Sequence, residues 1–595
     1  MAKRSRRPPL TDTLTTLEQS PSVPAERPVP APGRHVAVAG CVFLGYLLVS
    51  FVLYAVPMLG RFGTAFVGAG HGDARFFVWD LVWWPHALAN GLNPFHPTVV
   101  WAPSGLDMAW ATGIPGPALL LAPLTLAFGP VVASNVASIL APALSGWAAF
   151  LLCRRITDRV WPSVAGGYLF GFSSYEAGQL HGHVNLFLVF PVALAAYLVV
   201  RRLEGSLSRR AFVGFLAAVL VGEFLISTEV SATMALFGGL ALFGAAWMRP
   251  ELRPRLRALV RELGTAYAIA GVALAPYLFY VAVGFPPGPI RPLGSSTEDL
   301  LSFVVPRRTV LVGGQALRAV SRAFPANMSE DGGYLGLPLL VSLVHLGWAR
   351  WREPLTRGLL VFAGAAAVLS MGTWLHVDGH AVVPLPWSVL GRLPILEDAL
   401  PPRFTLYLWL AVAVLIARWL SVASPSWWRW AVVALGAALL VPNMAAPGFH
   451  RPATTPALFT SDAARSVVPA GRSALILEPT KGDEMLWQAE TWMAFPIAQG
   501  HTGPEPSAFR RLPVWHAIRD HRPTSISPGE LGAFLVSHDV GAILVDPRSE
   551  AAWRPLLAQT VGRRPARIGG IDVYEVPPGT IRPPIASARR PRSAR

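Results

Sequence analysis

Cysteine and lysine are scarce in this 595-residue sequence. Cys41 and Cys153 both fall within long apolar runs, so we expect them to be packing residues rather than a disulfide or a metal-binding pair. Lys3 and Lys481 are the only lysines, and charged residues make up 14% of the chain. The sequence also lacks a phosphate-binding glycine loop with lysine, a paired-cysteine zinc spacing and a nucleophile elbow. These absences argue against an ATP-driven pump.

Apolar residues, in contrast, are abundant. They make up 53% of the chain, the mean hydropathy is +0.44, and several apolar runs reach the roughly 20 residues needed to cross a bilayer. The net charge of +16 comes almost entirely from arginine. The arginines cluster between the apolar runs, which favours membrane topology over nucleic-acid binding as their role. We therefore expect a polytopic membrane protein surrounded by lipid, without a nucleic-acid partner. The arginine-heavy composition suggests a GC-rich bacterial genome.

The composition divides the chain into four segments. Residues 1–34 are polar, rich in proline and basic at the start, which predicts a disordered cytoplasmic tail without a cleavable signal. Residues 35–447 carry the apolar runs, with a first outer loop at 60–112. In residues 448–577, short β-like runs alternate with a helical pattern, which predicts a small α/β domain. Residues 578–595 are predicted to form a disordered basic tail.

The placement of arginine predicts about 11 transmembrane helices. Short loops rich in arginine stay cytoplasmic, and all such loops obey this rule if the N-terminus is cytoplasmic and the C-terminal α/β domain is extracytoplasmic. The piece at 113–128 is short and rich in proline, so we interpret it as interfacial. The expected fold class is an α-helical polytopic protein of the cell membrane with a C-terminal α/β domain. The predicted spans are residues 36–59, 131–152, 161–178, 184–200, 211–227, 230–248, 264–284, 335–349, 358–373, 403–420 and 429–445.

The first outer loop combines many aromatic residues with an aspartate. Aromatic rings favour the headgroup layer, so we expect short helices in that layer. Asp73 would then lie at the water–membrane boundary, where apolar neighbours would raise the pKa of its carboxyl and suit it to general-base catalysis. The alternative, which stays open, is that Asp73 only caps the helix that begins at Ala74. The aromatic residues concerned are Phe76, Phe77, Trp79, Trp83, Trp84, Trp101 and Trp110.

Other ionisable residues fall on the same predicted side of the membrane. His181 and His183 can bind a metal together with a carboxylate, or can be solvated turn residues. Glu229 flanks an outer turn. Arg403 lies at the mouth of a predicted span, where it can capture a phosphate or anchor the helix end to lipid. Arg307 is a weaker candidate for the same role.

Several motifs in residues 36–445 resemble the GT-C superfamily of integral-membrane glycosyltransferases, which use polyprenyl-phosphate sugars. The late segment Leu400–Phe404 is similar to an Arg-Phe element of the YfhO-like bacterial membrane proteins within that superfamily. Many members carry two acidic residues in the first loop, whereas this chain has Asp73, with His71 two residues earlier. The remaining motifs are Gly72-Asp73-Ala74-Arg75-Phe76, Pro115 to Leu120, Phe128-Gly129, Cys153-Arg154-Arg155 and Gly166 to Ser173.

The resemblance implies an inverting transfer of a sugar from a polyprenyl-phosphate donor to a cell-envelope glycan or lipid on the outer face. Asp73 would deprotonate the acceptor hydroxyl, and Arg403, with Arg307, would stabilise the departing phosphate. A divalent cation, Mg²⁺ or Mn²⁺, is left open as a cofactor. Two other classes of function also stay open: a lipid-linked glycan flippase or transporter, and a non-catalytic scaffold of envelope assembly. Residues for the acceptor or a metal would be His71, His181, His183 and Glu229.

Overall fold

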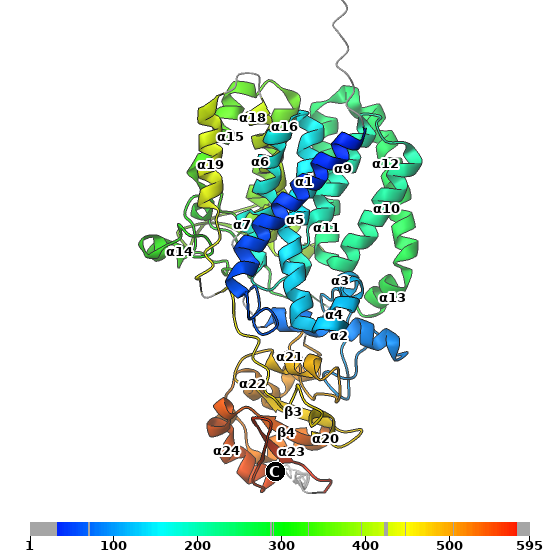
Figure 1. Ribbon diagram of the computed structural model, residues 1–595, viewed down its shortest axis with the longest axis vertical. Helices are drawn as coiled ribbons and strands as arrows, with labels where there is room; N and C mark the ends of the chain where they lie inside the picture. Colours follow the sequence, from blue (N-terminus) through cyan, green and yellow to red (C-terminus); the bar gives the residue numbers. More distant parts are fainter. Residues whose placement is uncertain are drawn as a thin grey trace, which may run out of the picture.

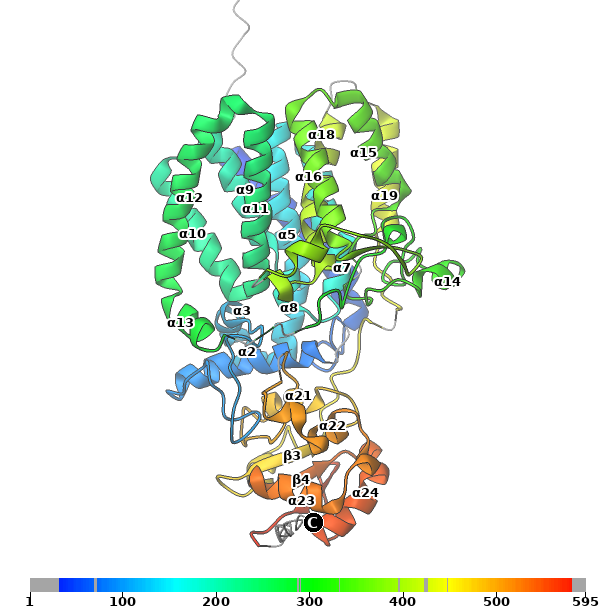
Figure 2. The same ribbon diagram turned by 180° about the vertical axis from the view of Figure 1, so that it is seen from behind.

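The computed structural model describes residues 32–579, apart from 69–71, 286–287, 289–290, 331, 394–395, 422–425, 447 and 504. It consists of a helical bundle with a smaller unit of strands and short helices at one end (Figures 1 and 2). This C-terminal unit comprises the described residues from 448 to 579. The two predicted tails fall almost wholly outside the described residues, and so does His71.

Each predicted span overlaps a helix. The eleven ranges correspond to α1 (Pro32–Ser50), α5 (Pro130–Thr157), α6 (Val160–Gly171), α9 (Phe190–Leu203), α10 (Arg209–Ile226), α11 (Thr228–Met248), α12 (Arg253–Ala273) with α13 (Ala275–Val283), α15 (Gly336–Arg350), α16 (Pro354–Ser370), α18 (Thr405–Ser421) and α19 (Trp427–Leu439).

Fewer helices than predicted are long and apolar enough to cross a membrane. Within the described residues there are five such segments, and the bent pair α12–α13, with 78° between its two parts, would be a sixth. α6, with 12 residues, and α19, with 13, are shorter than the roughly 20 residues that a span needs. The structure therefore supports a membrane protein but does not confirm about 11 spans. The five segments are His35–Met58, Pro130–Thr157, Val184–Leu203, Thr228–Met248 and Pro401–Ser421.

Close helix packing at the centre of the bundle explains the glycine-rich segment of α6. A Cβ on Gly171 would lie 2.3 Å from the carbonyl oxygen of Pro142 in α5, and one on Gly167 would lie 2.5 Å from that of Gly146. No larger residue fits at these crossings, because backbone atoms cannot move aside. After α6 the chain makes two short helices, α7 (Ser174–Gln179) and α8 (Val184–Phe187), and the turn between them carries His181 and His183.

The first loop crosses the end of the bundle as α2 (Asp73–Ala89), between the bundle and the C-terminal unit (Figure 2). α3 (Pro115–Leu120) and α4 (Ala122–Phe128) follow it. With six and seven residues they are too short to span a bilayer, in line with the interfacial interpretation of 113–128.

The predicted environment of the loop's aromatic residues is wrong for six of the seven. The side chains of these six are at most 4% exposed, so they lie inside the protein and not at a lipid surface. They belong to the same hydrophobic core as the strands of the C-terminal unit. The indole N–H groups of Trp79, Trp83 and Trp101 donate to protein acceptors and not to headgroups. That of Trp79, for example, donates to Gln488 Oε1 at 2.7 Å. The six are Phe76, Phe77, Trp79, Trp83, Trp84 and Trp101.

The C-terminal unit contains a four-stranded sheet in the order β3-β4-β6-β5. β3 (Ser473–Leu477) and β4 (Val540–Val545) are parallel and fully buried, as their unbroken apolar sequences lead one to expect. Strands and helices thus alternate in this unit, as the β-like runs and helical pattern of its sequence lead one to expect. The other elements are β5 (Ala566–Ile568), β6 (Ile571–Glu575), α20 (Ala464–Val467), α21 (Asp483–Glu490), α22 (Pro513–Arg519), α23 (Pro528–Ser537) and α24 (Pro547–Val561).

Two long connections have little regular structure. The first joins α13 to α15 and contains the short helix α14 (Arg318–Ser321). The second joins α16 to α18 and contains the short helix α17 (Trp387–Leu390) and a hairpin of β1 (Trp374–Val377) and β2 (His380–Pro384), which the sequence did not predict. A 3₁₀ turn, Pro401–Phe404, then leads into α18 and places Arg403 at the end of the bundle that faces α2.

Candidate active site

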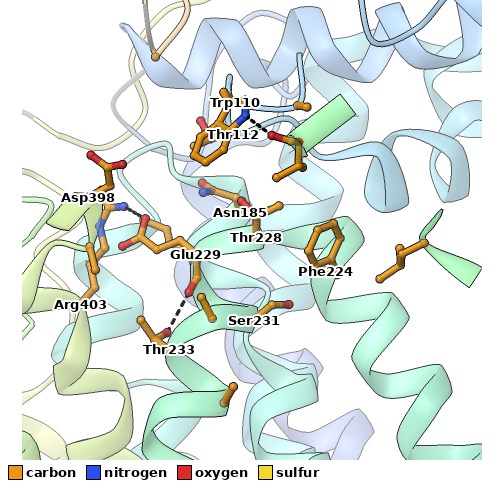
Figure 3. A pocket seen from close by; sticks show the side chains of 18 of the residues that line it. Trp110, Thr112, Asn185, Phe224, Thr228, Glu229, Ser231, Thr233, Asp398 and Arg403 are labelled. Carbon is orange, nitrogen blue, oxygen red and sulfur yellow. Dashed lines mark hydrogen bonds and ion pairs between the residues drawn. The ribbon is translucent and has the colours of Figure 1, made fainter. Parts of the chain in front are cut away.

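A cavity of about 560 Å³ lies where α2, the turn before α8, and helices α10 to α13 meet (Figure 3). One side of it is polar and the other is apolar. The apolar side comes from α10, α12 and α13 and includes Leu220, Phe224, Tyr267, Leu274 and Leu278. The polar side is formed by Asp73, Thr112, His183, Asn185, Thr228, Glu229, Arg291, Asp398 and Arg403.

Asp73 is the first residue of α2, and its carboxyl faces two histidines. Nε2 of His183 lies 3.3 Å from Oδ2, and Nε2 of His501 lies 4.0 Å from Oδ1. Gly72 precedes the helix with φ +58°, a conformation that favours glycine. No side chain caps this helix start. The capping alternative for Asp73 is therefore not realised, and its carboxyl is turned toward the cavity.

The surroundings of Asp73 hold the pKa of its carboxyl well below the usual range. Burial opposes this shift, but the hydrogen bond and charge of His183 outweigh it, helped by His501 and Arg291. The N-terminal end of α2 also favours negative charge. The predicted rise in the pKa of Asp73 is thus wrong, because polar and cationic groups surround the carboxyl and its side chain is 51% exposed.

A chain of hydrogen bonds connects Asp73 to Arg403. Nδ1 of His183 lies 2.8 Å from Oε1 of Gln179, and Nε2 of Gln179 donates to Oε2 of Glu330 at 3.5 Å. Arg403 binds Glu330 through Nε at 2.9 Å and Nη2 at 2.5 Å, a bidentate pair. The two predicted site residues Asp73 and Arg403 therefore belong to one cavity and one network.

All three guanidinium nitrogens of Arg403 donate hydrogen bonds to carboxyl groups. Besides Glu330, its Nη1 binds Glu229, which stands in the first turn of α11 behind the cap residue Ser227 (Figure 3). Burial raises the pKa of Glu330, yet the Arg403 guanidinium outweighs it and lowers that pKa to about 2. Two carboxyl groups, those of Glu229 and Glu330, thus share the one guanidinium of Arg403.

Arg291 is a cavity cation that the sequence analysis missed. It is exposed, and within the part of the chain that the structure describes it forms no ion pair with a carboxylate. Its positive charge contributes to the lowered pKa of Asp73. The residue stands in a proline-rich stretch between α13 and the hairpin, and no motif marks it.

Two predicted residues lie away from the cavity lining. Arg307 donates from Nη2 to the carbonyl of Phe324 at 3.0 Å and stacks on its ring at 5.3 Å. His181 is buried against Phe449, with ring centroids 4.4 Å apart. His183, by contrast, lines the cavity.

The described residues contain no complete set of ligands for the hypothesised divalent cation. Across them, no three side chains of the metal-binding types gather in a way that could hold an ion. Asp73 and His183 are adjacent, but His71 falls outside the described residues. The metal therefore stays a prediction.

The fold matches that of solved membrane glycosyltransferases. The chain is similar to arabinofuranosyltransferase AftD from Mycobacteria, with a TM-score of 0.56 and 15% identity over 92% of this chain and 40% of that one, so the match spans well under half of AftD. It is also similar to ArnT from Cupriavidus metallidurans bound to undecaprenyl phosphate, with a TM-score of 0.46 and 14% identity over 93% and 100% of the two chains. An oligosaccharyltransferase from Archaeoglobus fulgidus tethered with an acceptor peptide matches with a TM-score of 0.47 and 13% identity over 88% and 71%.

No protein-family model matches the sequence, and a search of curated proteins finds no match. The likeness to AftD, a GT-C glycosyltransferase, shows that the two chains share a fold, in agreement with the fold that the sequence resemblance predicts. The subdivision into the YfhO-like group stays a prediction.

Proposed function

We propose that this protein is a membrane glycosyltransferase that moves a sugar from a polyprenyl-phosphate donor to a cell-envelope glycan or lipid, with inversion. The observation that supports this most directly is the cavity in which a carboxylate, Asp73, and a cation, Arg291, line the polar side while the opposite side is apolar. A lipid-linked sugar likewise has an apolar part, its hydrocarbon tail, and a polar part, its charged sugar phosphate. The shared fold with an arabinofuranosyltransferase agrees with this function.

Asp73 is the proposed base. The acceptor oxygen forms a bond to the anomeric carbon while the bond from that carbon to the phosphate oxygen breaks, and the hydroxyl proton passes to Asp73. The lowered pKa keeps Asp73 ionised. The acceptor hydroxyl becomes strongly acidic as its oxygen gains positive charge, so a weakly basic carboxylate suffices in the transition state. His183 holds the carboxylate in place by its contact with Oδ2.

Arg291 is the proposed group that meets the departing phosphate. Nε, Nη1 and Nη2 of Arg403 already donate to Glu229 and Glu330, so an incoming phosphate would have to compete with two carboxyl groups there. Arg291 faces the same cavity, and no carboxylate among the described residues forms an ion pair with it. We therefore assign phosphate stabilisation to Arg291, and to Arg403 the role of holding both glutamates. Arg307 lies outside the cavity lining and is not part of this proposal.

The proposed setting is the outer face of a bacterial cell membrane, with the N-terminus in the cytoplasm and the C-terminal unit outside. The distribution of arginine along the sequence supports this orientation. The lipid tail of the donor would lie along α10, α12 and α13, where Leu220, Phe224 and Leu278 form an apolar wall.

The proposal can be tested by in vitro transfer from a panel of radiolabelled polyprenyl-phosphate sugars to envelope extracts. Wild-type protein should label an acceptor, and Asp73→Asn should reduce the rate by roughly 10²–10⁴-fold. Asp158→Asn is the matched control, because Asp158 is a highly exposed residue beyond the end of α5. Absence of transfer across the panel with well-folded protein would overturn the proposal. If the protein is instead a transporter or a scaffold, Asp73→Asn should have little effect on its function.

A further inference from the structure

The N-terminus of α2 is held by the C-terminal unit. The backbone N–H of Gly72 donates to the carbonyl of Lys481 at 3.1 Å. Three residues along, Nη2 of Arg75 lies 2.6 Å from Oδ1 of Asp483, and neither side chain is more than 5% exposed. Both contacts come from the start of α21, and they lie on either side of Asp73 in the sequence. The proposed base thus stands on a helix start whose two flanks are fixed from the far end of the chain.

A second set of contacts extends this attachment along the first loop. The backbone of Val99 accepts from Ile497, and that of Trp101 donates to Gln499, at 2.9 and 3.2 Å. The indole of Trp101 donates to Thr502 Oγ1 at 3.1 Å and packs edge-on against Phe509 and Trp515, both with centroids at 4.7 Å. The first loop and the C-terminal unit therefore share one core rather than a surface contact.

The ion pair of Arg75 is set among further acids. Glu478 and Glu484 are buried beside Asp483, so three carboxyls surround one guanidinium. Burial of such a cluster contributes little net stability, but a buried pair fixes the relative orientation of the segments that carry it. This geometry suits a role in orientation, since removal of the Asp483 charge would leave Arg75 without its direct partner.

The C-terminal unit also reaches the cavity itself. His501 approaches Asp73 from the side opposite to His183, with Nε2 at 4.0 Å from Oδ1. A Cβ on Gly72 would lie 3.3 Å from the same nitrogen, so the ring is packed closely over the start of α2. Gly503, two residues on, forms part of the cavity wall.

We infer that the C-terminal unit completes the reaction centre: Asp483 is a positioning residue that orients Asp73 through Arg75, and His501 is a second positioning residue that confines the Asp73 carboxylate. The catalytic part of this inference rests on the proposed function, whereas the structural part does not.

The test uses the full-length protein with Asp483→Asn, and with Asp539→Asn as the control. Asp539 forms an ion pair with Arg472 in the same unit, but its side chain is 66% exposed and the pair is remote from α2. Hydrogen exchange of the backbone amides of residues 72–80 should accelerate about tenfold or more in Asp483→Asn and stay at the wild-type rate in Asp539→Asn. Unchanged exchange in Asp483→Asn would overturn the inference, whether or not any transfer has been detected.

Transfer kinetics give a second, separate measurement. Once wild-type transfer is established, Asp483→Asn should lower kcat at least tenfold while the KM for the donor stays within about twofold, because the base is misoriented and the donor contacts remain. If Asp483→Asn does not yield folded protein, the kinetics of His501→Gln are the test. This substitution should not disturb folding, because His501 is partly exposed. A fall in kcat of fivefold or more at an unchanged thermal midpoint supports the inference, and wild-type kcat overturns it. A wild-type protein that transfers nothing while exchange responds as expected would reject the proposed function alone.

Discussion

Nε2 of His183 contacts Oδ2 of Asp73 at 3.3 Å, while Nδ1 of the same ring faces Gln179. One imidazole therefore links the proposed base to the buried acids around Arg403. Because Gln179 Oε1 can only accept a hydrogen bond, it directs a proton to Nδ1. Nε2, the other nitrogen of the ring, faces the Asp73 carboxylate, so a single side chain contacts both groups.

Replacement of His183 should change how transfer depends on pH. His183→Ala removes the largest influence that lowers the pKa of Asp73, and burial, which raises that pKa, remains. Asp73 would then bind a proton at higher pH than in the wild type. We expect transfer to fall more at pH 5 than at pH 8, measured as kcat over that range. His516→Ala, in α22, serves as control and should keep the wild-type profile. A parallel decrease at both pH values would contradict this account.

Replacement of Arg403 should chiefly affect stability. Arg403→Met leaves Glu330, which is 3% exposed, without its bidentate partner, and Glu229 loses the same cation. Breaking a buried ion pair from one side costs about 3–5 kcal/mol. The protein should unfold at a clearly lower temperature in detergent, as read by tryptophan fluorescence. A wild-type unfolding temperature would show that the network is not structural.

Replacement of Arg291 should have the opposite effect: it should lower the rate of transfer and leave thermal stability unchanged. Arg291→Met removes an exposed cation without breaking an ion pair of the described residues, so the thermal midpoint should stay within about 1 °C. Transfer should fall by roughly 10²-fold if Arg291 stabilises the departing phosphate. Arg291→Lys should recover part of the rate, because the positive charge is kept. Full activity in Arg291→Met would remove it from the site. Arg308→Met is a matched control, since Arg308 is not among the cavity residues.

The acid cluster around Arg75 predicts a pH dependence of stability. Burial, and then the mutual repulsion of the acids, raise the pKa values of Glu478 and Glu484, that of Glu484 to about 7 from an ordinary 4.5. The folded state thus keeps a proton that the unfolded chain releases at lower pH. Stability therefore falls as pH rises from about 4.5 to about 7, and the loss is complete above that.

Glu484→Gln cannot ionise and escapes this loss. The variant should match the wild type near pH 4.5 and unfold at a temperature higher by roughly 2 °C or more at pH 8. Thermal midpoints measured at the two pH values check the expectation. Glu530→Gln is the control, since Glu530 lies in the exposed capping box of α23 and its pKa is lowered, not raised. A variant that is less stable than the wild type at pH 8 would contradict this expectation, because it would show that ionised Glu484 stabilises the folded state.

The sequence was sufficient to locate the helices of the bundle and to single out Asp73 as a candidate. Apolar runs and arginine-rich loops mark helices directly, and an isolated aspartate after the first apolar run stands out. The lengths and bends of the helices were harder to predict. Hydropathy does not show that α12 and α13 are bent by 78° relative to each other, or that α6 ends after 12 residues.

The pairing of Arg403 could not be predicted. Its partners Glu330 and Glu229 are 73 and 174 residues away in the sequence. An arginine at a helix mouth has the same local sequence whether it is free to bind phosphate or held by two carboxylates. Its pairing is set by tertiary contacts alone, and so is the low pKa of Asp73.

The aromatic loop shows the same limit. A tryptophan with one apolar face and one polar edge suits a headgroup layer and a protein interface equally well. Only the fold shows that Trp101 is enclosed by Phe509 and Trp515. His501 was missed for the same reason, because nothing near it in the sequence connects it to Asp73.

The distance along the chain between Trp79 and its partner Gln488, 409 residues, has a consequence for biogenesis. The ribosome releases the first loop early, yet the core that this loop shares with the last quarter of the polypeptide cannot close until that part has been synthesised. Contacts so remote in sequence form late. A truncated or still-growing chain would therefore insert its helices before the core behind Asp73 is complete, so under the proposed function transfer would begin only after translation has finished.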